Sequence, residues 1–551
     1  FLQMSRLFSE ALYRRIAALF STCVLGAAGL TGRLYTLVNS DEIAPAAANQ
    51  SQYTLSVSDE RAKIYDAHFS PITGAASGRF RTAVFPSSVS ASELTALLRT
   101  VPDEKKESVS ELYQSGKPFV TETEADVSGR TLFSFPISDE DPSDQPAVHL
   151  IGYLDYEGKG VSGLQKGYED YLSENGRRIE ITGKSDALSR TIAGETPEIR
   201  ITGSESAGLV LTLDLRLQKA VETLGERMLQ KGAVVLMDPF TGQIRAMASF
   251  PSYSPADIPA ALADTENAPL LNRALLSYSV GSTYKIVTAA AAMETLGHKA
   301  CLERKYTCLG AVDVHGQLFR CHLRSGHGEL DLFDAFQLSC NPWFITLGLE
   351  TGGSALLKTA KAFGFGESLR LADGITASSG ALPDEYELSA PAASAYLSFG
   401  QGFLLASPVQ IARMLSAVVN GGKLVSPTLI LGKTEDGRTL IPEADVLPRR
   451  VIDEKTAAQL KAIVSYAVMA DDSSGAKPQK TTAGGKTATA QTGQTDENGN
   501  ELEHGWFAGF FPADDPQLVC VVLAENAGFG NRSAAPVFAA IADAAAEILC
   551  Y

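Results

Sequence analysis

Apolar residues recur along this chain with two different periods, and the change of period marks its architecture. Between Tyr53 and about Gly208, short strand-like runs (YTLSV, RTLFSFPI and AVHLIGYL) are separated by Gly, Asp and Ser. Two stretches in the same region, SASELTALLRTV and SGLQKGYEDYLSEN, have the spacing of helices. The pattern predicts an extended α+β region that ends near residue 208.

A different pattern begins at Leu209, where a strand leads into an amphipathic helix. LVLTLDLRLQKAVETLGERML places Leu217, Val221 and Leu224 on one helix face. The strands GAVVLMD and GQIRAMAS follow, joined by a turn at 239–242. The chain ends with the strands GWFAGFF and LVCVVLAE and the helix APVFAAIADAAAEIL. Residues 209–551 are therefore predicted to form an antiparallel sheet closed by their first and last segments around a helical middle.

The N-terminal segment is apolar enough to span a membrane. Arg14 and Arg15 precede a run from Ile16 to Gly32 without charge, and the apolar residues resume after Arg33 as far as Val38. We expect an anchor over residues 16–38, a cytoplasmic tail over 1–15 and an extracytoplasmic remainder, because positive charge favours the inner side. A cleaved signal peptide is the alternative, but a clean A-x-A site is missing. Residues 39–52 are predicted to be a linker.

The charge balance excludes one class of partner. The chain has 551 residues and a net charge of -17, from 64 acidic and 47 basic residues. Nucleic-acid binding depends on clustered Lys and Arg, so we expect no nucleic-acid partner. The 7 cysteines are too few and too unevenly placed for a disulfide scaffold.

Candidate chemistry begins with a lysine at an unfavourable place. In SVGSTYKIVTAAAAM, Ser282 and Lys285 stand at the start of a predicted helix, where positive charge costs up to about 1 kcal/mol. Residues three apart share a helix face. Burial and the helix N-terminus both lower the pKa of an amine, and a neutral amine beside a serine can activate it as a nucleophile. A serine N-cap followed by a solvated lysine is the alternative.

Two further motifs favour the catalytic interpretation. QLSCNPWF contains Ser339 and Asn341, and GGKTATAQTG contains Lys486 and Thr487. Ser-x-x-Lys, Ser-x-Asn and Lys-Thr-Gly, in this order, are the motifs of the penicillin-recognising acyl-serine transferases.

The sequence segments around these motifs resemble those of class B penicillin-binding proteins, the membrane-anchored peptidoglycan D,D-transpeptidases. They are VVLMDPFTGQIRAMASFPSYSP, NRALLSYSVGSTYK, SFGQGFLLASPVQIARMLSAVVNGG and HGWFAGFFPADDPQLVCVVLAEN. DERAKIYDAHFSPITG and GVSGLQKGYEDYL are similar to the N-terminal pedestal of that family. The residues around SCNPWF resemble its elongation and spore-cortex branch. The resemblance implies a transpeptidase domain over 209–551, with an antiparallel sheet and a helical subdomain, on a pedestal of dimerisation type over 39–208.

The resemblance also implies roles for single residues. Ser282 attacks the penultimate D-Ala carbonyl of a stem peptide and forms an acyl-enzyme, Lys285 takes its proton, and β-lactams acylate the same serine. Ser339 passes a proton to the leaving amine, Asn341 orients Lys285, and Lys486 polarises the Ser339 hydroxyl. The substrate-binding residues are Thr487, Ala488 and Thr489, with the backbone N–H groups of Ser282 and Thr489 as oxyanion hole.

Ala488 departs from the family pattern, which has Gly at this place. A Gly on an edge strand usually marks close backbone approach, so the extra methyl is either tolerated or tilts the substrate. A weakly active or silent scaffold that recruits wall-synthesis partners is therefore the alternative function. A carboxypeptidase or β-lactamase shares the motifs, but not the pedestal and anchor.

A cluster of cysteines and histidines suggests a metal. Cys308, Cys321 and His327 have spacings that suit tetrahedral zinc, although a close C-x-x-C pair is absent. The open alternatives are a Cys308–Cys321 disulfide and free thiols. The candidates for a fourth ligand are Cys340, Asp331 and His322. Any zinc is expected to be structural, since the serine chemistry requires no cofactor.

The expected partners are peptidoglycan stem peptides ending in D-Ala-D-Ala, β-lactams, the membrane and a membrane glycosyltransferase. The glycosyltransferase is expected as a separate partner, because the sequence before residue 209 shows no group of residues large enough for a glycosyltransferase domain. The sequence does not distinguish elongation, division and sporulation, and it does not identify the acceptor residue of the stem.

Overall fold

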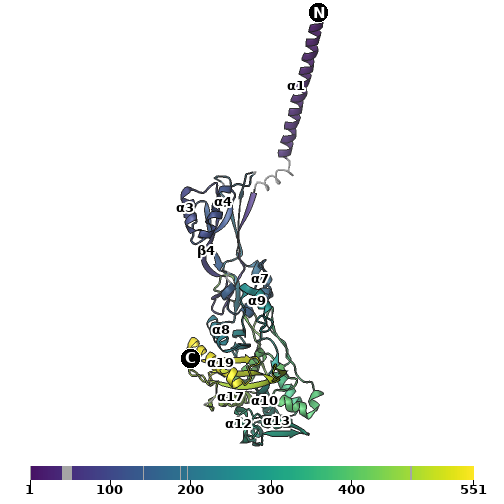
Figure 1. Ribbon diagram of the computed structural model, residues 1–551, viewed down its shortest axis with the longest axis vertical. Helices are drawn as coiled ribbons and strands as arrows, with labels where there is room; N and C mark the ends of the chain where they lie inside the picture. The colour runs from purple at the N-terminus through teal and green to yellow at the C-terminus, as the bar shows by residue number, and fades with distance from the viewer. Residues whose placement is uncertain are drawn as a thin grey trace. The chain divides into compact units, whose positions relative to one another are not determined.

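A computed structural model describes residues 2–39, 52–139, 142–186, 188–194, 196–471 and 474–550 (Figure 1). The chain forms two compact units. The smaller one comprises Phe1–Glu60, Ala76–Ser138 and Arg177–Thr202, and the larger one comprises Arg61–Ala75, Asp139–Gly176 and Gly203–Tyr551. The expected division into 39–208 and 209–551 stays a prediction, and most of the expected linker over 39–52 lies outside the described residues.

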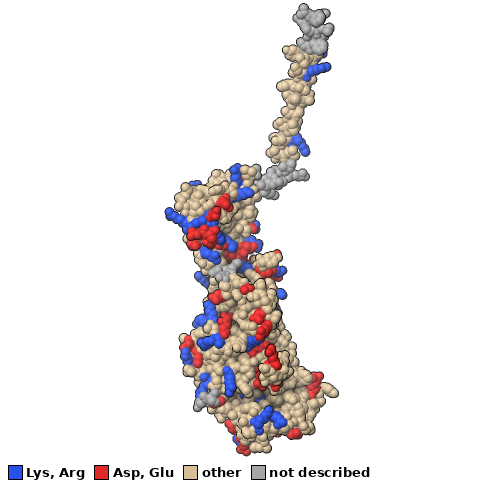
Figure 2. Space-filling model, in the orientation of Figure 1, with Lys and Arg blue, Asp and Glu red and all other residues tan. Residues whose placement is uncertain are grey.

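The N-terminal helix α1 (Leu2–Val38) contains the predicted span over residues 16–38. Among the described residues, Glu10–Val38 is the one helix segment long and apolar enough to cross a membrane. Its large apolar side chains are exposed, and charged side chains are sparse along it (Figure 2). An apolar helix with an exposed surface fits a single-pass membrane anchor.

The smaller unit has two three-stranded sheets, ordered β1-β7-β8 and β5-β4-β6. Its strands are β1 (Gln52–Asp59), β4 (Ala75–Val84), β5 (Phe119–Thr123), β6 (Leu132–Asp139), β7 (Arg178–Lys184) and β8 (Glu198–Thr202). Its helices are α3 (Ala91–Thr100), η1 (Asp103–Lys105) and α4 (Lys106–Ser115). A Ser90–Glu93 capping box starts α3, which satisfies N–H groups that the first helical turn leaves open. The predictions of strands at YTLSV and RTLFSFPI and of a helix at SASELTALLRTV are confirmed.

The prediction of a strand in AVHLIGYL is wrong, because Val148–Ile151 forms the short helix α5. Ala147 has a φ of 53° and starts the turn, and its N–H donates to the carboxylate of Glu222 at 2.7 Å. A short apolar run does not distinguish a buried helix from a strand. The contact that decides between them comes from a helix far along the sequence.

The centre of the larger unit is an antiparallel sheet ordered β11-β10-β26-β25-β24. Its strands are β10 (Gly232–Met237), β11 (Ile244–Phe250), β24 (Gly484–Thr495), β25 (Glu501–Phe511) and β26 (Leu518–Ala524). The expected pairing of the first strands with the last is confirmed by β10, which pairs with both β11 and β26.

Alternate residues of this sheet enter two different cores, as the period of a strand requires. Val235 and Val521 belong to the core that includes α10 (Lys285–Leu296) and α16 (Pro408–Val419). Val234 and Val522 belong to the core on the other face. That face is covered by α8 (Leu215–Met228) and α19 (Ala535–Leu549). Both helices were predicted, and α19 has the bounds of the predicted helix APVFAAIADAAAEIL.

Helices cover the face of the sheet that carries α10. The elements between β11 and β24 that matter for the site are η4 (Gly281–Tyr284), α11 (His298–Glu303), β13 (Tyr306–Cys308), β14 (Ala311–Val314), β15 (Gln317–Arg320), β16 (Gly328–Leu330), α12 (Leu332–Gln337), α13 (Asn341–Thr351), α14 (Gly353–Ala362), α15 (Pro391–Ser398) and α17 (Glu454–Met469). A second, mixed sheet has the order β22-β21-β9-β2-β3. Its strands are β2 (Lys63–Tyr65), β3 (Pro71–Thr73), β9 (Gly208–Leu211), β21 (Ile430–Thr434) and β22 (Ile441–Pro442).

Candidate active site

Ser282 lies in a tight turn that is fixed from two sides. It belongs to η4, and Lys285 is the first residue of α10. Gly281 has a φ of 55°, and its N–H donates to the carbonyl of Gly400 at 3.0 Å. A Cβ on Gly400 would come within 1.9 Å of the Gly281 oxygen. The turn therefore needs glycine in both segments, at positions 281 and 400, and this close approach holds Ser282 in place.

Ser339 and Asn341 lie at the junction of α12 and α13. Asn341 is the first residue of α13. Ser339 has a φ of 51°, a backbone angle that residues other than glycine rarely adopt. The backbone N–H of the intervening Cys340 donates to Ala335 at 2.9 Å. Strained backbone of this kind is frequent where a side chain must be aimed at a functional site.

The three motifs begin to converge through Lys285. Its Nζ donates to the carbonyl of Ser339 at 2.8 Å, to Oδ1 of Asn341 at 2.8 Å and to Oγ of Ser339 at 3.1 Å. The Ser339 hydroxyl in turn donates to Oγ of Ser282 at 2.9 Å. The Ser339 hydroxyl therefore lies between the amine and the Ser282 hydroxyl.

Lys285 is 0% exposed and Lys486 is 2% exposed, which is unusual for lysine. Burial, followed by the positive charge of Lys486, lowers the pKa of Lys285 well below its ordinary value. Burial lowers the pKa of Lys486 to about 7. Both amines are thus much more readily neutral than an exposed lysine.

Lys486 to Thr489 lie on β24, the edge strand of the central sheet. Lys486 Nζ donates to the carbonyl of Thr487 at 3.1 Å, and among the described residues it makes no hydrogen bond to Ser339. Thr489 Oγ1 accepts from the N–H of Gly530 at 3.3 Å. Thr487 and Thr489 are half-buried, unlike their buried neighbours Lys486 and Ala488.

The methyl of Ala488 points into the core. Ala488 is 3% exposed, and a Cβ built on Gly281 would lie 3.3 Å from the Ala488 Cβ. The side chain thus faces the turn that carries Ser282. Close packing at this point makes Ala488 a contact between β24 and the turn.

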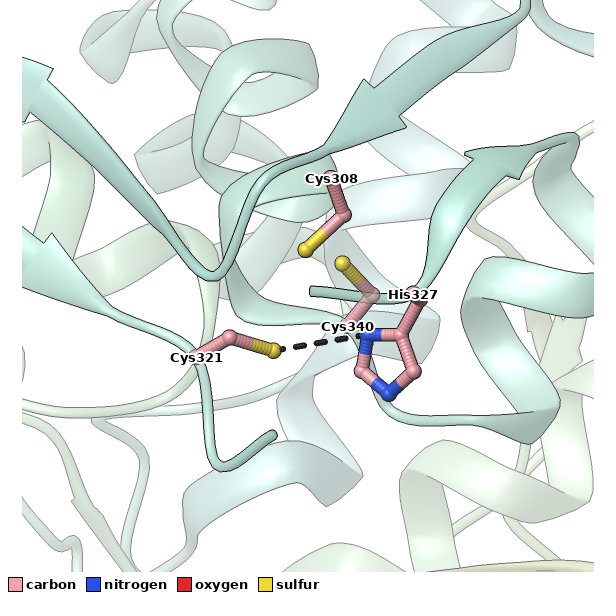
Figure 3. A group of neighbouring side chains, drawn as sticks. All are labelled: Cys308, Cys321, His327 and Cys340. Carbon is pink, nitrogen blue, oxygen red and sulfur yellow. Dashed lines mark hydrogen bonds between the residues drawn. The ribbon is translucent and has the colours of Figure 1, made fainter. Parts of the chain in front are cut away.

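Four metal-ligand side chains gather beside the site (Figure 3). The ligand atoms of Cys308, Cys321, His327 and Cys340 lie within 4.8 Å of one another. Cys321 Sγ is 3.6 Å from Nδ1 of His327, and the described cysteines are free thiols. Of the three candidates for the fourth ligand, the structure brings Cys340 into the cluster. Asp331 instead caps α12 by accepting from the N–H of Asp334.

Three thiols and one imidazole form a donor set that suits zinc. The Cys340 thiol hydrogen-bonds to Cys321 and lowers the pKa of the Cys321 thiol, so a thiolate, the form that binds a metal, is favoured there. Cys340 stands between Ser339 and Asn341, so the cluster is joined to both residues through one peptide bond on each side.

Comparisons with known proteins agree with this geometry. The family model of the penicillin-binding protein transpeptidase domain matches residues 232–543. Stage V sporulation protein D of Bacillus subtilis is 29% identical over 459 residues, which are 79% of this chain and 68% of that protein. Peptidoglycan D,D-transpeptidase PbpA of Mycobacterium tuberculosis is 32% identical over 342 residues, 58% of this chain and 67% of the relative.

Solved structures share the fold. PBP2 of Helicobacter pylori, in a complex with MreC, has a TM-score of 0.65 and 21% identity, and the match covers 91% of this chain and 99% of that one. Penicillin-binding protein A of M. tuberculosis, as a ceftriaxone acyl-enzyme complex, has a TM-score of 0.60 and 24% identity, covering 76% and 94% of the two chains. The predicted fold class, α+β with an antiparallel sheet and a helical subdomain, is confirmed.

Proposed function

Because this chain belongs to the class B penicillin-binding proteins, the serine D,D-transpeptidases of peptidoglycan, we propose that Ser282 is its acylated nucleophile. The observation that carries the proposal is the unbroken path of hydrogen bonds from Ser282 through Ser339 to Lys285. Ser282 Oγ attacks the penultimate D-Ala carbonyl of a stem peptide, the bond to the terminal D-Ala breaks, and an acyl-enzyme forms. An amine of a neighbouring stem then attacks the ester, which completes the cross-link and frees Ser282.

The contacts of Lys285 favour a neutral amine whose lone pair has a defined direction. A neutral amine has two N–H groups and one lone pair. The two shortest contacts are to acceptors that cannot donate, the carbonyl of Ser339 and Oδ1 of Asn341. They occupy both N–H groups, so the lone pair faces the Ser339 hydroxyl. For the transfer, both hydroxyls turn from the orientation that they have in the structure, so that Ser282 donates to Ser339 and Ser339 donates to the lone pair of Lys285. Ser282 then loses its proton to Ser339, and Ser339 loses its own to Lys285, with the reverse transfer delivering a proton to the leaving amine.

We assign the substrate side to β24. The hydroxyls of Thr487 and Thr489 bind the terminal carboxylate, and Lys486 supplies positive charge beside it. The N–H groups of Ser282 and Thr489 form the oxyanion hole, where one donor typically contributes roughly 3–4 kcal/mol. Ala488 is buried, and its methyl lies where a Cβ on Gly281 would be 3.3 Å away, which supports a role of Ala488 in spacing the strand from the turn.

Labelling with a fluorescent penicillin tests the assignment. We expect one labelled peptide, containing Ser282, and no label in Ser282→Ala. Thr283→Val, which changes a neighbouring buried hydroxyl that bonds to Val280, is the matched control and keeps the label. An unlabelled wild-type protein would instead support a silent scaffold. Product analysis with a donor stem and an amine acceptor then separates cross-linking from hydrolysis.

We also propose the arrangement at the membrane. Residues 16–38 anchor the chain, residues 1–15 lie in the cytoplasm, and the pedestal (39–208) and transpeptidase domain (209–551) lie outside. Arg14 and Arg15 before the span support this orientation. A membrane glycosyltransferase supplies the glycan strands. Protease treatment of cells without an outer barrier should digest the C-terminal region, and protection of this region would reverse the orientation.

We propose that Cys308, Cys321, His327 and Cys340 hold a structural zinc ion. When bound, zinc cross-links β13, the loop after β15 and the segment of Ser339, and it takes no part in the acyl transfer. We expect about one zinc per purified chain, a loss of the metal in Cys321→Ser, and a lower thermal midpoint after chelation. Cys301→Ser, which changes a buried cysteine outside the cluster, should keep the metal. Purified protein without zinc and with reactive thiols would overturn the proposal.

A further inference from the structure

The two buried lysines of the site differ in how their charge is compensated. Lys285 has hydrogen-bond acceptors for all of its N–H groups, in Ser339 and Asn341. Lys486 has one acceptor among the described residues, the carbonyl of Thr487. Lys486 is also 2% exposed, so little of it is open to bulk water before substrate binds. A buried ammonium with a single acceptor requires a further stabilising contact.

An aromatic ring provides this contact. The ring of Phe336, on α12, has its centroid 5.6 Å from Nζ of Lys486. The ring of Phe344, on α13, lies 5.4 Å from Nζ of Lys285. Both rings are 0% exposed, and their centroids are 6.1 Å apart. The face of an aromatic ring attracts a cation within about 6 Å, and the attraction is stronger without water.

We propose that Phe336 is a positioning residue for the acyl transfer: its ring holds the Lys486 ammonium so that the unused N–H groups face the substrate carboxylate. This inference rests on the proposed role of Lys486 at the carboxylate. Burial lowers the pKa of Lys486, whereas a ring face favours the charged form of an amine. Phe336 thereby keeps a charge available at a place where the surrounding backbone offers a single acceptor.

Phe344 provides a matched comparison. It has the same residue type and burial as Phe336 and a similar distance to a lysine, but that lysine has three hydrogen-bond partners besides the ring. Leu in place of either Phe leaves a cavity of similar size. A difference between the two variants therefore reports the electrostatic contact and not the loss of packing.

The experiment compares Phe336→Leu, Phe344→Leu and Phe336→Tyr in the full chain. The second-order acylation constant is measured with benzylpenicillin and with its methyl ester, which lacks the carboxylate charge. For Phe336→Leu we expect the acid-to-ester ratio to fall about tenfold or more, as loss of a desolvated cation–π contact implies. Phe336→Tyr, which keeps the ring, should retain the ratio, and Phe344→Leu should change it less than about threefold.

Equal ratios in wild type and Phe336→Leu would overturn the inference, as would equal losses in Phe336→Leu and Phe344→Leu. Thermal midpoints of the variants are measured alongside, and a fall of the ratio without a difference in midpoint between the two Leu variants supports the inference. Failure of the proposed function is distinguishable, because the wild-type protein would then show no acylation by either compound.

Discussion

Replacing Ser339 by Gly and by Ala separates the role of its hydroxyl from the strain of its backbone. Ser339 has a φ of 51°, a left-handed conformation in which a Cβ costs roughly 1–2 kcal/mol. Its Oγ bridges Ser282 and Lys285 at 2.9 and 3.1 Å. Both substitutions remove the hydroxyl, whereas Ser339→Gly alone also removes the Cβ. The two variants should therefore be equally inactive but differ in stability.

The magnitudes follow from these two contributions. Loss of the proton path should reduce acylation about 10²–10⁴-fold in both variants, which is the usual contribution of general acid–base catalysis. Relief of strain favours Gly, and the greater freedom of Gly in the unfolded chain offsets roughly 0.5–1 kcal/mol of that gain. Ser339→Gly should remain about 0.5–1 kcal/mol more stable than Ser339→Ala, a difference in Tm of about 2 °C.

The assay is the acylation rate with a fluorescent penicillin, together with thermal unfolding of the same preparations. Metal content is measured as a control, because Cys340 is the next residue. Acylation at the wild-type rate by either variant would refute the proton path through Ser339. A Ser339→Ala protein as stable as Ser339→Gly would refute the argument from backbone strain.

Further substitutions test the charges and the packing of the site. Lys486→Met removes a positive charge that lowers the pKa of Lys285, so the acid limb of the pH–rate profile should move to higher pH; an unmoved limb would argue against this coupling. The same variant should be stabilised more at pH 7 than at pH 10, measured as Tm. Burial lowers the pKa of Lys486 from 10.5 to about 7, so the unfolded chain binds more protons between these values, and the wild-type fold loses stability as the pH falls; an equal gain at both pH values would contradict this. Ala488→Val should cost roughly 1–3 kcal/mol by overpacking against Gly281 and slow acylation, whereas Ala488→Gly should acylate within about threefold of wild type. Gly400→Ala should reduce acylation more than about tenfold, because its Cβ would meet the Gly281 oxygen, and an unchanged rate would show that this contact does not fix the turn.

Residue patterns alone identified much of this protein. The continuous apolar runs in GAVVLMD and LVCVVLAE predicted the buried strands β10 and β26, and the apolar run after Arg15 predicted the helix α1. The order and the residues of the three motifs predicted the family, which the family model confirms. These features are local, because the period of side chains and the chemistry of a motif are properties of short segments.

Contacts between distant segments decided the remaining features. Glu222 accepts from Ala147 where AVHLIGYL turns into a helix, and no residue of that run encodes this contact. Packing against the turn of Ser282 directs the Ala488 methyl into the core. No signal in the sequence associates Phe336 with Lys486, and the two residues come together because α17 packs against both α12 and β24.

The cysteine cluster shows the same division. The spacing of Cys308, Cys321 and His327 suggested a metal, but three residues were open as the fourth ligand. Tertiary structure brought Cys340 to the other three and used Asp331 as a helix cap. Sequence spacing fixes which ligand types are available, whereas the distances among ligand atoms depend on how separate strands and loops pack.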